Sequence, residues 1–82
     1  MNLTDVRRVK EKYIEQLMSL KNVVSVGIGR KKVQDRETDE LAIIVGVTQK
    51  LPPSLIQNRD FIPRVLDGVK TDVIQVGKIR PL

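Results

Sequence analysis

The sequence predicts a small α+β domain in which one long N-terminal helix packs on a mainly antiparallel sheet of three strands. Apolar residues recur at helical spacing over residues 4–20. Over residues 23–33 and 40–50 they alternate with small or polar residues, as in strands. A chain of 82 residues is long enough for one domain, so we treat residues 1–82 as a single unit.

The helix predicted over residues 4–20 has one apolar stripe and one charged face. Thr4 is positioned to cap its free amides, and Asn22 tolerates the left-handed conformation in which many helices end. The apolar stripe consists of Val6, Val9, Tyr13, Leu17 and Leu20, widened by Ile14 and Met18.

Two predicted strands follow, joined by a short polar connection at residues 34–39 that favours an antiparallel hairpin. In the first strand, at 23–33, we expect Val24, Val26 and Ile28 to form the apolar face. The second strand, at 40–50, is apolar on both sides and therefore central. Small side chains would let another surface approach the backbone, either this chain's own helix, which we favour, or a partner; they are Ser25, Gly27, Gly29 and Gly46.

The third predicted strand covers residues 71–77, after a turn at Asp67 and Gly68. The two prolines at 52 and 53 end the second strand, because proline has no amide to donate. Between them and the turn we expect an ordered loop with one helical turn.

Composition restricts the function. The chain has no His and no Cys, which removes the usual base of a serine nucleophile, disulfides and thiolate metal sites, so we expect no catalytic residue, metal or cofactor. Because a domain this small is only marginally stable alone, we expect a homo-oligomer. No stretch is apolar enough to cross a membrane and no signal sequence is evident, so we expect a cytoplasmic protein without a membrane partner.

The net charge of +5 suggests an anionic or acidic partner. Alternation places Arg30 and Lys32 on one strand face about 7 Å apart. The candidate residues for binding an anion or a partner are Arg30, Lys31, Lys32, Arg7 and Arg8. The triplet at 30–32 has a simpler interpretation, which we prefer, as charges that protect a sheet edge from aggregation. We do not expect nucleic-acid binding, since Tyr13 and Phe61 are the only rings available for base stacking.

Two other patterns are weak. The glycines at 27 and 29 lie inside a strand pattern and not between a strand and a helix, so they do not indicate a phosphate-binding loop. The carboxylates at 35, 37, 39 and 40 lack the glycine of a calcium loop and surround Arg36, so we interpret them as a solvated hairpin tip.

Several blocks carry a family resemblance: NVVSVGIG at 22–29, TDELAIIV at 38–45, QKLP at 49–52, IP at 62–63 and DGVKTDVIQVG at 67–77. In order and spacing the chain resembles a region that precedes the protease domain in bacterial trypsin-like serine peptidase homologues. It departs from that pattern at residues 34–37, which lack glycine, and at Lys70, where proline is usual. The resemblance implies that the catalytic residues belong to a downstream domain, so none is carried over.

We therefore expect a non-catalytic protein-interaction module, acting as a leader, chaperone-like or inhibitory segment of a peptidase-type protein. The first alternative is an oligomer that sequesters a small anion such as a nucleotide between subunits. The second is a weak nucleic-acid binder.

Overall fold

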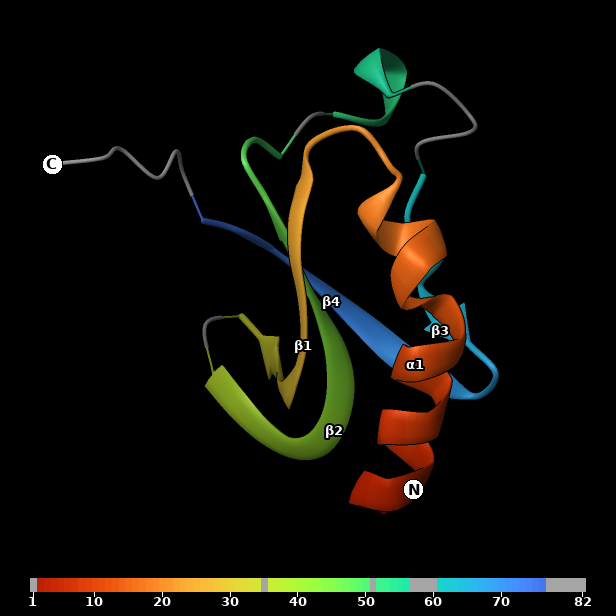
Figure 1. Cartoon of the computed structure of the whole chain (residues 1–82). Coiled ribbons are helices and arrows are strands. Elements are labelled where there is room, and N and C mark those ends of the chain that lie inside the picture. Colours follow the sequence, from red (N-terminus) through yellow and green to blue (C-terminus); the bar gives the residue numbers. More distant parts are fainter. Residues whose placement is uncertain (1, 35, 51, 57–60, 77–82) are drawn as a thin grey trace, which may run out of the picture.

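The computed structural model describes residues 2–34, 36–50, 52–56 and 61–76, and it confirms the α+β class (Figure 1). Along the chain the elements are the helix α1 (Leu3–Met18), the strands β1 (Val23–Val33) and β2 (Arg36–Val47), the short 3-10 helix η1 (Pro53–Leu55), and the strands β3 (Val65–Leu66) and β4 (Val69–Gln75).

Helix α1 begins one residue before the predicted start and ends two residues before the predicted end. The cap is Asn2, whose side-chain oxygen accepts a hydrogen bond from the amide of Asp5 at 2.9 Å, so the assignment of Thr4 as cap was wrong. At the other end the cap is Ser19, which has a right-handed backbone, so the helix does not end at Asn22 as expected. Asn22 does adopt the left-handed conformation, with a φ of 74°, but in the turn that leads into β1.

Strands β1 and β2 form the predicted antiparallel hairpin. The first strand has the predicted bounds. The second was expected at 40–50 but begins at Arg36, because Arg36 and Glu37 continue the pairing opposite Val33 and Lys32, and it ends at Val47. Polar residues at the tip of a long hairpin can stay in register when their main-chain groups are paired, and composition alone does not show this.

The sheet has four strands in the order β1-β2-β4-β3 among the described residues, so the expected number of three was wrong. The missed strand, β3, has two residues and is too short to show an alternating pattern. It pairs with β4 across Asp67 and Gly68, whose φ angles of 48° and 84° are the two positive values that a tight two-residue hairpin turn needs. The closing strand therefore covers 69–75 instead of 71–77, and Gly77 lies outside the described residues.

Strand β4 lies parallel to β2, with Val73 opposite Val45, which makes the sheet mixed. A parallel pairing needs a long crossover, and residues 48–68 supply it. This segment contains η1, the single helical turn that was expected there.

The hydrophobic core lies between α1 and one face of the sheet. A β-bulge changes which valine of β1 faces it: Val23 pairs with Val47, but the next paired residue is Ser25, opposite Gly46. Val23 is therefore buried, whereas Val24, which was expected on the apolar face, is 42% exposed. The buried core cluster consists of Val6, Val9, Leu17, Val23, Ile43, Val45, Val47, Leu66 and Val69, with Tyr13, Leu20, Val26, Ile28, Leu41, Ile62 and Val73 packed against it.

Candidate interaction site at the outer strand

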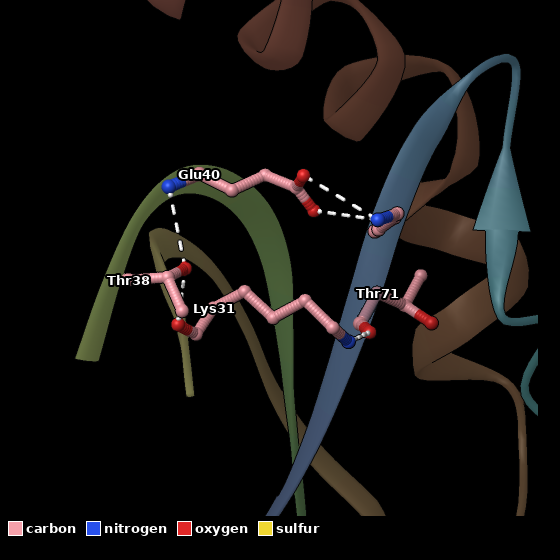
Figure 2. Close-up of polar contacts among 5 residues, drawn as sticks. Lys31, Thr38, Glu40 and Thr71 are labelled. Carbon is pink, nitrogen blue, oxygen red and sulfur yellow. Dashed lines mark hydrogen bonds and ion pairs between the residues drawn. The ribbon is translucent and has the colours of Figure 1, made fainter. Parts of the chain in front are cut away.

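The basic triplet at the end of β1 is split by the fold. Alternation turns Lys31 to the sheet face opposite the helix, where its ammonium donates a hydrogen bond to the main-chain carbonyl of Thr71 on β4 at 3.1 Å (Figure 2). Lys31 is half-buried. Its charge is used inside the domain, so it contributes less to an anion site than the sequence suggested.

A bend in β2 brings Lys31 within reach of β4. Three residues of β2, 38–40, lie opposite Lys31, between the Arg30–Leu41 and Lys32–Glu37 pairs. The hydroxyl of Thr38 donates to the Lys31 carbonyl at 2.7 Å and accepts from the amide of Glu40 at 3.3 Å, which closes the extra loop of chain. Figure 1 shows the resulting strong curve of β2.

Residues 30–34 and 36–40, which we name the folded arm, are held against β4 by two further contacts. The amide of Lys32 donates to the carboxylate of Asp72 at 3.0 Å. The carboxylate of Glu40 pairs with the ammonium of Lys70 at 3.1 Å (Figure 2). The arm is therefore tied to the sheet face that α1 leaves uncovered.

Arg30 and Lys32 keep their side chains at the surface. Among the described residues Arg30 forms one ion pair, with the carboxylate of Asp39 at 3.9 Å, and both side chains are solvent-exposed, so this pair is weak. The side chain of Lys32 is exposed. These two cations remain available to a partner.

The two arginines of α1 point in different directions. Lys12 and Tyr13 both donate to Asp67 in the β3–β4 turn, at 2.7 and 2.8 Å, which fixes the flank of the helix that faces β3 and β4. At 100° per residue, Arg7 lies on the opposite flank, toward β1, and Arg8 lies on the solvent side. Only Arg7 is therefore on the β1 side.

Arg7 and Arg30 lie at the same end of the molecule. Helix α1 and strand β1 are joined by residues 19–22 and run side by side in opposite directions (Figure 1). A helix rises 1.5 Å per residue, which places Arg7 about 20 Å from that junction. A strand rises about 3.3 Å per residue, which places Arg30 about 23 Å from the same junction. Lys10 shares the flank of Arg7; helical periodicity could have identified it, and sequence reasoning missed it.

The three glycines of this sheet face fall into two groups, according to the space beside them. A Cβ atom added to Gly46 would lie against the Ser25 hydroxyl and 3.2 Å from Val76, and one added to Gly29 would lie 3.0 Å from the side chain of Ile44. A Cβ atom added to Gly27 would meet nothing within 4 Å. Gly29 and Gly46 therefore make room for side chains of the sheet itself, and Gly27 is open.

Helix α1 does not cover this small face, contrary to the interpretation we favoured. The core cluster contains Ile43 and Val45, and Val26 and Ile28 pack against it. Because side chains alternate along a strand, residues 25, 27 and 29 lie on the other face.

The outer strand β1 directs half of its main-chain groups away from the sheet. The Val47 carbonyl accepts a hydrogen bond from the Val76 amide at 2.9 Å, so the main-chain amide and carbonyl of Val47 point toward β4. Because these directions alternate along a strand, every second residue of β2 before Val47 also points its main-chain groups toward β4. One of these is Val45, so its partner Val26 directs its amide and carbonyl away from β2. The β1 residues with outward main-chain groups are Val26, Ile28 and Arg30.

Among the described residues no strand pairs with β1 on this side. We name as the open edge the outer side of β1 from residue 23 to residue 33. Val24, 42% exposed, and Met18, 44% exposed, are its exposed apolar neighbours near the start of β1, and Met18 lies on the same flank of α1 as Arg7. Val33, 51% exposed, is apolar at the other end of the strand. No sequence signal reveals an open edge, because it depends on the order of the strands.

Within the described ranges, no group of three or more acidic side chains is placed to hold a metal ion. Asp35, one of the four carboxylates noted at the hairpin tip, lies outside those ranges. No helix in the described part of the chain is long and apolar enough to span a membrane.

Comparison with known proteins gave no assignment: no family model matches the chain, and no curated protein matches it significantly. The resemblance to the region preceding trypsin-like peptidase domains stays a prediction.

Proposed function

We propose that the protein is a non-catalytic protein-interaction module that binds an extended segment of its partner along the open edge of β1. The observation that carries the proposal is the outward direction of the main-chain groups of Val26, Ile28 and Arg30 on an outer strand of 11 residues. An added strand satisfies such groups by pairing with them, which is a common mode of peptide recognition.

The length of the open edge supports this function. Outer strands are usually short, covered, or interrupted by proline, because a long unpaired edge invites association. Strand β1 has no proline, and its charges are confined to residues 30–32. Seven residues, 23–29, remain without a charge to repel a partner strand.

The state of Lys31 favours this function over sequestration of a small anion. The hypothesis of a small-anion site requires the three cations at 30–32 to line one site. The Lys31 ammonium, however, donates a hydrogen bond to the Thr71 carbonyl. Arg30 and Lys32 remain for an anionic ligand or nucleic acid. A peptidase-type domain, which the sequence resemblance suggests as the partner, is the first protein to test.

The experiment is hydrogen exchange measured by NMR, with peptides selected from a displayed random library. In the free protein we expect fast exchange at the amides of Val26, Ile28 and Arg30, and slow exchange at Gly27, which pairs with β2. A peptide that adds a strand to β1 will slow exchange at those three amides. Selected peptides that bind without protecting any of them would refute the proposed edge function.

A further inference from the structure

We infer that the segment recognised at the open edge is an extended acidic peptide: apolar where it lies beside residues 24–28 of β1, and carrying Asp or Glu where it meets Arg30. This inference rests on the proposed function and names the chemistry of the partner.

The charges beside the open edge are concentrated at one end. Residues 23–29 of β1 are uncharged, and Arg30 follows them with an exposed side chain. Arg7 adds a cation from the neighbouring flank of α1 at the same end of the molecule. Lys10 adds another on that flank nearer the middle of the edge, about 15 Å along the helix from the junction.

The carboxylates described at this end are Asp39, 3.9 Å from Arg30 and fully exposed, Glu37, opposite Lys32 in the β1–β2 pairing, and Glu11, one turn after Arg7 on the same flank of the helix. The exposed cations Arg30, Lys32, Arg36 and Arg7 outnumber these carboxylates, so among the described residues this end of the edge is weakly basic, and the partner that complements it is acidic.

The other end of the open edge is apolar. Val24 is pushed outward by the β-bulge, and Met18 is exposed on the adjacent flank of the helix. Followed in the direction of β1, the edge therefore presents apolar side chains near Val24 and then cations near Arg30. In an antiparallel arrangement, which is the slightly more stable pairing, the acidic residues of the partner segment come at its N-terminal end.

A second copy of this chain fits the same edge less well. An antiparallel pair of β1 strands centred on Gly27 would place Arg30 of each copy opposite Val24 of the other, so no cation would gain a carboxylate. A parallel pair would place like charges side by side, which is unfavourable. Charge complementarity therefore selects an acidic segment over self-pairing.

The test uses synthetic fluorescent peptides with the full-length protein. One peptide has the sequence Asp-Glu-Asp-Thr-Val-Thr-Val-Thr, the second carries Asn-Gln-Asn in place of the acidic residues, and the third has the acidic residues at its C-terminal end. By anisotropy at low salt we expect the first to bind roughly tenfold more tightly than the second, as about three exposed ion pairs would give. The third will bind more weakly than the first, and the advantage of the first will shrink as salt rises.

Substitutions assign the effect to the open edge. Combined Arg7→Gln and Arg30→Gln should remove most of the advantage of the acidic peptide. The control is Arg64→Gln, which removes one charge beside β3, at the opposite side of the sheet. Because the control removes one charge and the combined variant two, a loss from Arg64→Gln at least half as large would mean that net charge alone attracts the peptide, and would overturn the inference.

The outcomes separate this inference from the proposed function. If library peptides protect the amides of Val26 and Ile28 but the acidic and neutral peptides bind equally, the acidic partner is wrong and the edge function stands. If the acidic peptide binds without protecting those amides while library peptides protect them, the acidic inference is overturned and the edge function stands. If neither kind of peptide protects them on binding, the edge function itself fails. If the peptide-free protein sediments as a dimer in which these amides are already protected, a second copy occupies the edge and the inference is overturned.

Discussion

The ammonium of Lys31 donates a hydrogen bond to the main-chain carbonyl of Thr71, which lies 40 positions further along the chain and 3.1 Å away. This bond ties the folded arm at the end of β1 to β4. It converts one residue of an apparent binding triplet into part of the domain's own structure.

Lys31→Met should therefore destabilise the protein, by about 1 kcal/mol, because a half-buried charged hydrogen bond is lost and a carbonyl is left without its donor. The free energy of unfolding in urea is the measurement. Lys32→Met is the matched control, since it makes the same change on the adjacent exposed side chain and should alter stability by less than about 0.5 kcal/mol. Equal effects of the two substitutions would contradict the structural role of Lys31.

Two glycines should respond in opposite ways to alanine. Gly27→Ala should leave stability unchanged or raise it by up to about 1 kcal/mol, because the added Cβ meets nothing within 4 Å and alanine has less backbone freedom to lose. Gly46→Ala should destabilise by about 1–3 kcal/mol, because the new methyl group is forced against Ser25 and Val76. Thermal unfolding of the two variants measures the contrast, and a destabilised Gly27→Ala would show that the open space is not there.

The β-bulge makes two adjacent valines unequal. Val23→Ala should cost about 2 kcal/mol, because it removes buried methyl groups from the core and leaves a small cavity. Val24→Ala should cost less than about 0.5 kcal/mol, because that side chain is 42% exposed. Denaturant unfolding of both variants tests the register of β1. The reverse order would restore the simple alternation that the sequence suggested.

Stability should fall in acid through Asp67. The hydrogen bonds from Lys12 and Tyr13 lower the pKa of this carboxyl below its ordinary value of 3.8. The folded state therefore binds a proton at Asp67 less readily than the unfolded state does. The contribution of ionised Asp67 to the free energy of unfolding is fully present above pH 3.8 and is lost as the pH falls through the lower pKa of the folded state. Stability measured between pH 6 and pH 2 should show this acid loss, and Asp67→Asn should reduce it while tolerating the left-handed backbone of the turn.

The contact between Lys12 and Asp67 should also make stability fall at high pH, when Lys12 loses its proton. The hydrogen bond to Asp67 and the attraction of its charge raise the pKa of Lys12 above its ordinary value of 10.5. This contribution is present below pH 10.5 and is lost as the pH rises through the higher pKa of the folded state. Both groups are exposed to solvent, so high salt should weaken the dependence at either end of the pH range. An Asp67→Asn protein with an unchanged pH profile would show that the contact does not form in solution.

The sequence by itself determined the local elements. Helical spacing located α1 to within one or two residues, strand alternation located β1 with its observed bounds, and Asp67 and Gly68 predicted the turn whose backbone angles only such residues adopt readily. These features depend on neighbouring residues, whose side-chain periods and backbone preferences can be read along the chain.

The tertiary structure alone decided the strand order, the parallel β2–β4 pairing, the bulge at Val24 and the bond of Lys31 to Thr71. Each of these depends on which distant segments pair, and main-chain hydrogen bonds between strands leave no mark in the pattern of side chains. The candidate site divides in the same way. Its cations were visible in the sequence. The open edge beside them became apparent only when the fold placed β1 at the outside of the described sheet, where no described strand pairs with the amides of Val26, Ile28 and Arg30.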